Sequence, residues 1–512
     1  MPATYTTPGV YVEEVDKGSK PIEAAGASMA AFVGITAEAS VKAIDPATGE
    51  RIPVESVLNK ATLVTNWTQF QNIFGGFTAG AYLPDAVYGY FSNGGGACYI
   101  TSIMALSELS EKDASIASAT IPPSSGKSKV FTVSAKQAGV GGNDLSVTIK
   151  ADEKGETFAM SVGGETKSGL TMKKGEGFVG DAEFSAVTLS DLGSSMPADG
   201  TYQLSGGGTS LPTAADFIGD VAKRTGLAGL EALDDVRLVL CPDLMVGYDG
   251  SDAFKERVKA VQTNLIADCE RLKYRFAVLD TPPGLNAQQA KEWREYVNYD
   301  TSYAAMYYPW IEVADLSDSP QTTKWIPPSG HVVGIYNRVD ARVGFHKAPA
   351  NEVVAGAISI ELNLTKGEQG VLNPIGVNCI RSFPGRGIRV WGARTLSSDG
   401  SWRYINVRRL FIVVGASLDQ GMQWVVFEPN DRMLWAKVRR DVNSFLSTIW
   451  LSGALFGSTK DEAFYVKCDD ELNPPEIRDL GQLIIEIGMA PVKPAEFVIF
   501  RLSQWAGPNA EG

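Results

Sequence analysis

Histidine is nearly absent from this sequence: His331 and His346 are the only two among 512 residues. The sequence therefore offers almost no histidine for a metal site or for a Ser-His-Asp triad. The G-x-S-x-G and H-E-x-x-H motifs are missing as well. Residues 126–128 resemble the end of a phosphate-binding P-loop, but Ile121 stands where that motif requires glycine. We therefore expect no catalytic residue, no metal and no cofactor.

Cysteine and long apolar runs are also scarce. The five cysteines are scattered and form no C-x-x-C pair, which predicts reduced, partly buried thiols rather than a disulfide framework or a zinc ribbon. The longest apolar runs, such as 410–414, fall far short of the roughly 20 residues that span a bilayer. Residues 1–8 carry neither the basic nor the apolar part of a secretory signal. We expect a protein that is made in the cytoplasm and does not insert into a membrane.

Basic charge is in short supply, since the net charge is -13. A general nucleic-acid binder needs a basic face to replace phosphate counterions, so we expect no direct nucleic-acid partner. A chain of 512 residues is also too long for one compact core, and its length predicts roughly two to four domains.

The pattern along the chain predicts a multidomain protein of mixed α/β and α+β class. Residues 213–315 alternate buried strands with helices, which is typical of a largely parallel sheet covered by helices. Residues 105–212 are rich in Ser, Gly, Thr and Lys, contain no Trp or Arg, and alternate with a period of two, which predicts a small antiparallel β domain. We expect these parts: an N-terminal arm (1–20), a central α/β domain (21–104 with 213–345), an inserted β domain (105–212), a C-terminal domain (346–494), and a C-terminal strand and tail (495–512).

Asp280 is the one residue whose position is typical of an enzyme site. It ends a buried strand and precedes Thr281-Pro282-Pro283, where carboxylates of α/β enzymes often bind metals or substrates. The alternative is that Asp280 caps the turn into the next helix, because no partner residues cluster near it in the sequence. An enzyme with a doubly wound domain and a carboxylate site near Asp280 is thus the second functional hypothesis.

Short motifs along the whole chain, outside the inserted domain, resemble those of the contractile tail sheath family of myovirus-type phages, R-type bacteriocins and phage-like injection systems. The motifs that carry the resemblance are Thr7–Glu14, Phe32–Gly34, Phe74–Phe77, Tyr90–Ile100, Ala348–Asn351, Leu372–Arg381, Val390–Leu396, Tyr404–Leu410, Phe427–Asn430, Leu434–Trp435, Phe445–Leu446, Gly453–Gly457, Asn473–Pro474 and Pro491–Phe497.

The resemblance implies a tail-sheath fold with an inner C-terminal domain that the N-terminal segment completes. It implies a structural subunit that polymerises as stacked hexameric rings around an inner tube and contracts to drive that tube through a target envelope. The implied partners are copies of the chain itself, the inner tube protein, and baseplate and terminator or cap proteins. Assembly is expected in the bacterial cytoplasm, and the final site is a phage tail or an extracellular or cell-anchored injection particle.

The resemblance also implies that arms at both chain ends leave their own subunit and add a strand to a neighbour's sheet. Both ends carry short strand-forming runs that are too short to be stable alone but suit strand addition. Pairing within the same subunit is the alternative. The residues expected to exchange are Val10, Tyr11, Val12, Phe497, Val498, Ile499 and Phe500.

Arginines are concentrated after about residue 330, whereas residues 216–330 are net acidic. This asymmetry favours contacts between basic patches and acidic faces of neighbouring subunits, although pairing within one subunit fits equally well. The candidate basic residues are Arg403, Arg408, Arg409, Arg439 and Arg440.

Overall fold

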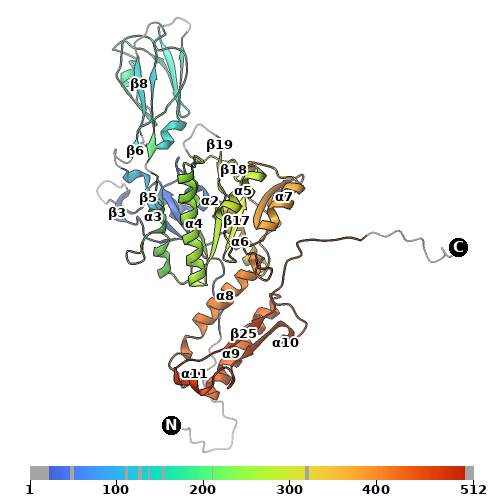
Figure 1. Ribbon diagram of the computed structural model, residues 1–512. Helices are drawn as coiled ribbons and strands as arrows, with labels where there is room; N and C mark the ends of the chain where they lie inside the picture. The colour runs from blue at the N-terminus through green and yellow to red at the C-terminus, as the bar shows by residue number, and fades with distance from the viewer. Residues whose placement is uncertain are drawn as a thin grey trace, which may run out of the picture. The chain divides into compact units, whose positions relative to one another are not determined.

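The structure of the chain is a computed structural model, which describes residues 22–45, 51–109, 114–124, 130–136, 139–152, 156–209, 211–317 and 322–501 (Figure 1). It divides into two compact units. The C-terminal unit consists of Met1–Ala25 and Val413–Val492, and the main unit of Gly26–Ile412 and Lys493–Gly512. The expected N-terminal arm, residues 1–20, lies outside the described residues.

A nine-stranded sheet, ordered β20-β23-β22-β17-β16-β15-β1-β5-β4, forms the centre of the main unit. Its middle strands pair in parallel, and the strands at both ends pair antiparallel. Parallel strands that are buried on both faces need continuous apolar runs, and the sequences AAFVGIT and AAMYY of β1 and β17 supply them. The strands are β1 (Ala30–Thr36), β4 (Thr62–Val64), β5 (Cys98–Ala105), β15 (Leu238–Leu240), β16 (Phe276–Asp280), β17 (Ala304–Tyr308), β20 (Glu352–Val353), β22 (Val377–Phe383) and β23 (Gly387–Val390).

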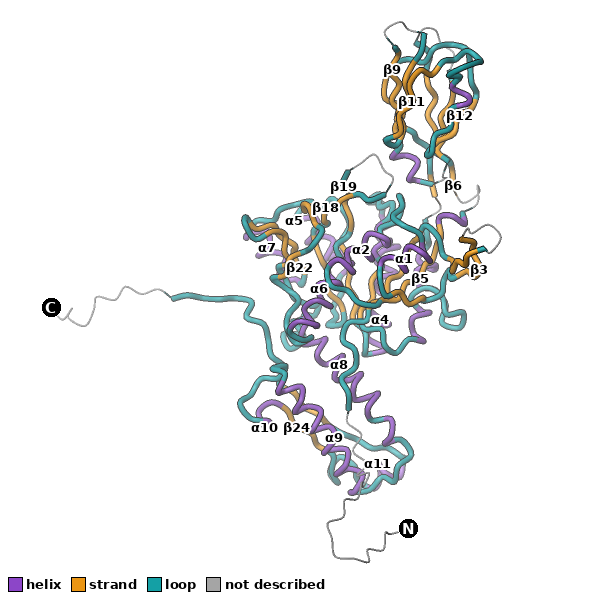
Figure 2. Tube along the Cα trace, turned by 180° about the vertical axis from the view of Figure 1, so that it is seen from behind, coloured by secondary structure: helices purple, strands orange, loops and turns teal. Residues whose placement is uncertain are grey.

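Helices cover both faces of this sheet (Figure 2). Alternate residues of β1 point to opposite faces, so Phe32 belongs to the apolar cluster beneath α2 and α6, and Val33 to the cluster beneath α4 and α5. The sequence therefore builds an α/β layered unit, as its strand–helix alternation predicts. The helices of the main unit are α1 (Trp67–Phe74), α2 (Leu83–Ser92), α3 (Ala214–Ile218), α4 (Asp252–Leu272), α5 (Ala287–Val297), α6 (Ser329–Arg342) and α7 (Lys366–Leu372).

Two smaller sheets complete the main unit outside the inserted region. Strands β18, β19 and β21 form one antiparallel sheet, and β2 and β3 form a hairpin. All five cysteines are buried and unpaired, as their scattered spacing predicts. These strands are β2 (Ser40–Ile44), β3 (Arg51–Ser56), β18 (Ile311–Ala314), β19 (Thr323–Ile326) and β21 (Ala357–Ile360).

The inserted β region, residues 114–209, interrupts the chain between β5 and α3. Its strands pair antiparallel in sheets ordered β11-β10-β9-β13, β12-β8-β7 and β14-β6, which confirms the expected antiparallel β class. Buried and half-buried residues alternate along β8 and β10, and the buried ones form an apolar cluster of this region's own residues. The strands are β6 (Ala114–Ser115), β7 (Ser118–Ile121), β8 (Phe131–Ala135), β9 (Ser146–Ala151), β10 (Phe158–Val162), β11 (Glu165–Leu170), β12 (Val187–Ser190), β13 (Gly200–Gln203) and β14 (Gly208–Thr209).

The C-terminal unit is built around helix α9, whose apolar stripe is buried. Residues 22–25 of the N-terminal segment belong to this unit: the backbone N–H of Ala25 donates to Ser417 Oγ at 2.9 Å, and a Cβ on Gly421 would lie 2.7 Å from Ile22. The expectation that the N-terminal segment completes the C-terminal domain stays a prediction, because residues 1–21 lie outside the described residues. The elements are the end of α8 (Ile405–Gly421), α9 (Arg432–Leu451), α10 (Lys460–Ala463), β24 (Phe464–Lys467), α11 (Pro475–Asp479) and β25 (Glu486–Met489).

The division between the units lies within α8, at 412/413, rather than at the expected 345/346. The reason is that β22 pairs in parallel with β17, with Val377 opposite Met306, so residues 352–390 extend the main sheet. The motifs after residue 346 form one block in the sequence but belong to two units. None of the helices among the described residues is both long and apolar enough to cross a bilayer.

Candidate functional site

Four adjacent apolar side chains are exposed near the end of the described chain. Phe497, Val498, Ile499 and Phe500 are 71%, 69%, 79% and 85% exposed. Residues 494–501 form no helix or strand, and in the part of the chain that the structure describes no strand pairs with them. Burying one such side chain fully gains about 1.5–3 kcal/mol, so the isolated chain leaves a large gain unrealised. We call residues 493–501 the C-terminal arm.

The carboxylate of Glu496 fastens the C-terminal arm to the main unit. Arg394 donates from Nε to Oε1 at 2.8 Å and from Nη2 to Oε2 at 2.7 Å, which is a bidentate ion pair. Asn373 Nδ2 donates to Oε1 at 2.6 Å, and Tyr404 Oη donates to Oε2 at 3.0 Å. We call these four residues the Glu496 clamp. Only 10% of the Arg394 side chain and 19% of the Glu496 side chain are exposed.

The electrostatics of the clamp favour the charged form of Glu496. Burial by itself raises the pKa of this carboxyl, but the hydrogen bonds from Arg394 and Asn373 outweigh burial, and the pKa lies below its ordinary value. Glu496 is therefore an ionised, satisfied anchor that stands immediately before the exposed Phe497.

Backbone contacts in the main unit hold Arg394 in place. The side chain of Asn378 accepts from the Arg394 N–H at 2.7 Å and donates to the Arg394 carbonyl at 2.8 Å. A Cβ on Gly392 would lie 2.8 Å from Asn378 Oδ1, and Gly376 has a φ of +82° with its missing Cβ 2.5 Å from the Thr395 carbonyl. Only glycine fits these two positions.

Motifs that are far apart in the sequence thus meet at the clamp. Leu372–Arg381 supplies Asn373, Val390–Leu396 supplies Arg394, and Pro491–Phe497 supplies Glu496. The sequence indicates each of these motifs separately. It does not indicate that they contact one another, because Arg394 and Glu496 are separated by 102 residues and no local pattern predicts their pairing.

The C-terminal unit contains a small sheet of two strands. Strands β24 and β25 form a two-stranded antiparallel sheet in which Phe464 lies opposite Met489 and Lys467 opposite Glu486. Among the described residues neither strand has a second named strand as partner, although the chain that continues β25 forms a single bridge from Pro491 to Leu455. The outer edges of β24 and β25 themselves therefore have no strand beside them in the part of the chain that the structure describes. Two-stranded sheets are at best marginally stable alone, and β24 packs against α9. The expected donors Val10, Tyr11 and Val12 lie outside the described residues.

Two of the five candidate arginines are satisfied within their own chain. Arg409 is buried and forms an ion pair with Asp340, and Arg408 is buried with its guanidinium 3.6 Å from the centre of the Trp402 ring. For these two, the structure favours pairing within one subunit, because a buried guanidinium cannot reach a neighbour.

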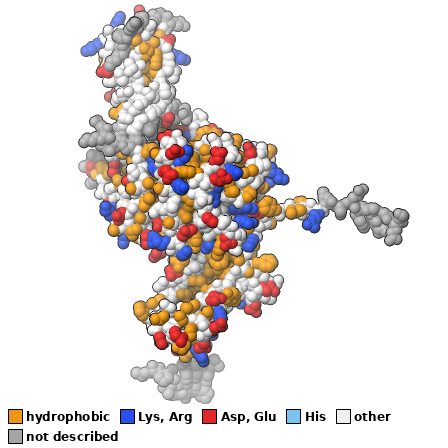
Figure 3. Space-filling view, in the orientation of Figure 1, with side chains coloured by type: hydrophobic (Ala, Val, Ile, Leu, Met, Phe, Trp, Pro, Cys, Tyr) orange, Lys and Arg blue, Asp and Glu red, His pale blue; other side chains and the backbone are white. Residues whose placement is uncertain are grey.

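The other three arginines differ from one another in their contacts. Arg439 is half-buried and donates to the Cys468 carbonyl, while Arg440 is exposed and lies 3.0 Å from Asp441. Arg403 is exposed. In the view of Figure 3, acidic and basic side chains are interspersed over the main unit rather than separated into faces of one sign. The expected charge contacts between subunits stay a prediction, with Arg403 as the clearest candidate.

Asp280 has a structural role that differs from the one considered above. Its carboxylate accepts from the Ser329 N–H at 3.0 Å and from the Ser329 hydroxyl at 2.5 Å, so it satisfies the first turn of α6. The next helix, α5, is capped instead by Asn286, which accepts from the Gln289 N–H. Burial raises the pKa of Asp280 to about 7, although the Ser329 hydrogen bonds act in the opposite direction.

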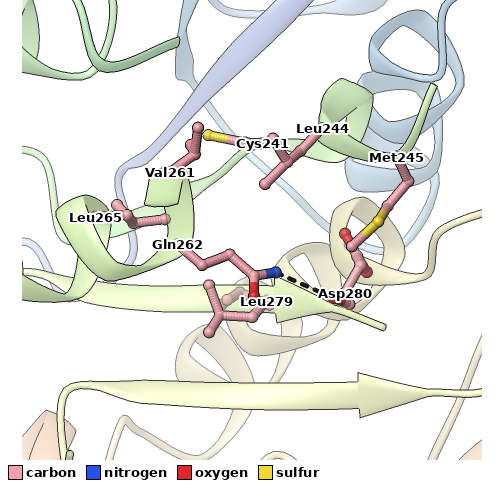
Figure 4. A pocket seen from close by; sticks show the side chains of 9 residues that line it. Cys241, Leu244, Met245, Val261, Gln262, Leu265, Leu279 and Asp280 are labelled. Carbon is pink, nitrogen blue, oxygen red and sulfur yellow. Dashed lines mark hydrogen bonds between the residues drawn. The ribbon is translucent and has the colours of Figure 1, made fainter. Parts of the chain in front are cut away.

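The cavity beside Asp280 is small and largely apolar (Figure 4). Its volume of about 10 Å³ holds about one water molecule. Gln262 crosses it and donates to the Asp280 carbonyl at 3.2 Å. No group of three or more His, Cys, Asp or Glu side chains that could hold a metal ion occurs among the described residues. The features that motivated the enzyme hypothesis are thus explained by helix capping.

Asp243, which follows β15, plays a similar part and was not singled out from the sequence. Its buried carboxylate accepts the N–H groups of Ile35, Tyr82 and Leu83, and thereby satisfies the start of α2. A Cβ on Gly34 would lie 2.2 Å from Asp243 Oδ2, which explains the glycine in the motif Phe32–Gly34. Strand ends that bind ligands in many α/β enzymes are used here to cap helices.

Two family models match adjoining parts of the chain. The model of the phage tail sheath protein central domain matches residues 228–396. The model of the phage tail sheath C-terminal domain matches residues 397–504, which include the C-terminal arm.

Individual relatives and solved structures agree with these matches. The chain is 24% identical to the tail sheath protein of Burkholderia phage BcepMu, over 95% of this chain and 94% of that protein. It is 27% identical to a putative prophage major tail sheath protein of Pseudomonas aeruginosa, over 57% of this chain and 74% of that protein. The fold is similar to the contracted sheath of the extracellular contractile injection system PVC (TM-score 0.59, 24% identity, 98% and 99% of the two chains). It is equally similar to the contracted helical sheath of the anti-feeding prophage (TM-score 0.59, 24% identity, 98% and 100%).

Proposed function

Because the chain belongs to the phage tail sheath family, we propose that it is a structural subunit of a contractile sheath, in which copies of the chain are joined by exchanged strands. The observation that carries this proposal is that one chain holds both an exposed apolar strand donor, Phe497–Phe500, and a two-stranded sheet with open edges. A donor and an acceptor on different surfaces give a contact that propagates from copy to copy instead of closing in a pair.

The C-terminal arm of one subunit adds a strand to the β24–β25 sheet of a neighbour. A strand of four to six residues gains about four to six backbone hydrogen bonds at about 0.5–1.5 kcal/mol each, so one link is worth a few kcal/mol. Such a link is weak between two dilute chains and persistent in a lattice where every subunit makes several. The segment around Val10–Val12 is the proposed donor to the other edge of the same sheet.

The assembled sheath consists of stacked six-membered rings around an inner tube protein, with baseplate proteins at one end and a terminator or cap at the other. The named states of the similar structures, which include contracted sheaths and a baseplate, support this assignment. The sheath stores its energy in the extended lattice and releases it when subunits repack, while the exchanged strands keep neighbours linked. The particle is assembled in the bacterial cytoplasm and works as a phage tail or as an injection particle.

Electron microscopy of the purified full-length chain tests this function. We expect the chain to polymerise above a threshold concentration into long, regularly striated tubes. A chain that stays a single species in sedimentation up to high concentration, and gives no tubes when mixed with its inner tube protein, would contradict the proposal.

A further inference from the structure

The Glu496 clamp lies where the C-terminal arm leaves the main unit. Glu496 is held by three residues of the main unit, and the next residue, Phe497, is already exposed. The chain reaches Glu496 directly from the C-terminal unit, which ends at Val492. The clamp therefore separates a short linker, Lys493–Ala495, from the part of the arm that is free to pair.

We propose that the Glu496 clamp is the fixed anchor of the C-terminal arm, which sets the arm's free length and ties the neighbour's C-terminal unit to this subunit's main unit. The proposal rests on the strand exchange of the proposed function and goes beyond it, because exchange alone does not say which unit of the donor subunit bears the force on the arm. With the clamp closed, force on the arm passes through Arg394 to the main sheet and bypasses the donor's own C-terminal unit.

The construction of the clamp supports an anchoring role. The four hydrogen bonds to Glu496 come from three side chains on three separate segments: the turn after α7, the chain after β23, and the residue before α8. The main-chain N–H and carbonyl of Arg394 are fixed by Asn378 in β22. By contrast, the ion pair of Arg432 with Asp470 in the C-terminal unit has side chains that are 81% and 62% exposed.

Opening the clamp would lengthen the free arm. Residues 493–496 span at most about 13–14 Å when extended, and this slack would separate the donor's main unit from the neighbour's sheet. The clamp also fixes the facing of the strand: Phe497 and Ile499 share one face and Val498 and Phe500 the other, and a slip of one residue exchanges them. A lattice that contracts as a unit requires the free length of the arm and the facing of its strand to be the same in every subunit.

Two insertions of equal size test the anchor directly. A Gly-Gly insertion between Glu496 and Phe497 lengthens the free arm and keeps the alternation of its side chains. The same insertion between Lys493 and Pro494 lies before the clamp, so the length of the arm beyond Glu496 does not change. We expect the first variant to form sheaths of variable helical order in which contraction stops before the far end, and the second to behave as the unaltered chain. Equal behaviour of the two variants would overturn the proposal.

Two substitutions test the clamp before assembly. In dilute chain, Arg394→Ala should raise the rate of Glu-C cleavage after Glu496 at least tenfold, because the carboxylate is no longer held. Glu496→Gln should raise hydrogen exchange at the Arg394 N–H, which donates to Asn378 beside the clamp. Arg432→Ala, which removes the exposed pair, should change neither. Unchanged cleavage and exchange in both clamp variants would overturn the anchor, whereas an unaltered chain that forms no sheath would instead contradict the proposed function.

Discussion

Strand β10 of the inserted β region has a partner on each side, β9 and β11, whereas β24 of the C-terminal unit has only β25 among the described residues. The apolar residues of the inserted region are gathered in a cluster of their own. In the C-terminal unit, large apolar side chains stand exposed at Phe427, Met433, Leu451, Phe456 and Leu480. The inserted region is complete as a folded module, and the C-terminal unit and arm have surfaces that a neighbouring molecule is expected to cover.

The largest effect is expected when the donor is removed. A chain that ends at Glu496 keeps the clamp and loses Phe497–Phe500, so we expect unchanged thermal unfolding and complete loss of polymerisation, measured by calorimetry and sedimentation. Removal of residues 1–15 should act in the same way on the other edge of the acceptor sheet. Loss of the unfolding transition in either variant would show that the arm belongs to its own subunit's core.

A pair of phenylalanine substitutions separates folding from assembly. Phe131→Ala in the inserted region removes a fully buried ring, and we expect a loss of about 3–5 kcal/mol in the stability of that region with sheaths still formed. Phe500→Ala removes a ring that is exposed in the single chain, so unfolding should change by less than about 0.5 kcal/mol while the threshold concentration for polymerisation rises. A stability loss in Phe500→Ala with an unchanged threshold concentration, or a loss of sheaths in Phe131→Ala with unchanged stability, would contradict the comparison.

The sequence predicts those parts of the molecule that depend on neighbours along the chain. Asn66 caps α1 by accepting from the Gln69 N–H, as its position before Trp67 indicates, and the parallel strands β15, β16 and β17 lie where their apolar runs predict. Periodicity was enough because burial on both faces of a sheet leaves a continuous apolar pattern.

Features that depend on distant residues could not be predicted. Helix α3 ends at Ile218 although the helical pattern of the sequence continues to residue 224, because Gly219 has a φ of +72° and its missing Cβ would lie 1.9 Å from the Thr225 carbonyl. Asp280 caps a helix that begins 49 residues later, and Glu496 pairs 102 residues back. For both carboxylates the local sequence shows a polar residue, and only the fold decides its partner.

The comparison extends to single carboxyl groups, because Asp280 is enclosed in the main unit and Glu496 is paired at its surface. The pKa of Asp280 rises from 3.8 to about 7 on burial, so between these values the folded state holds a proton that the unfolded state releases. Its contribution to stability is present at low pH and is lost as pH rises through about 7. Glu496 has a lowered pKa, so its contribution is present above its ordinary value and is lost as pH falls.

Asp280→Asn isolates the first of these effects. The amide can still accept from the Ser329 N–H and donate to the Ser329 hydroxyl. We expect the free energy of unfolding of the variant to fall less steeply between pH 5 and pH 7, by about 1 kcal/mol per pH unit, in denaturant titrations. Equal slopes for Asp280→Asn and the unaltered chain would show that Asp280 is ionised in the folded protein.

A smaller effect is expected from Arg403→Glu. This exposed side chain is the clearest remaining candidate for a charge contact between subunits, and one such contact is worth at most about 1 kcal/mol. We expect normal assembly, a lower fraction of contracted sheaths at low salt, and recovery at high salt, where screening acts over about 3–10 Å. Contraction that is unchanged at every salt concentration would remove Arg403 from the mechanism.

The smallest effect on assembly is expected from the largest deletion. Residues 110–209 contain the whole apolar cluster of the inserted region, whereas Leu106 and Leu211 pack against Ile35 and Val246 of the main unit. Replacing 110–209 with a short Gly/Ser linker therefore keeps both leucines and opens no main-unit core. Because the donor arm, the clamp and the acceptor sheet all remain, sheaths should form at the same threshold concentration and contract fully, as seen by electron microscopy. A deletion chain that unfolds as the unaltered main unit does, but forms no sheaths, would show that the inserted region lies in the lattice contacts and that its self-contained core does not make it dispensable.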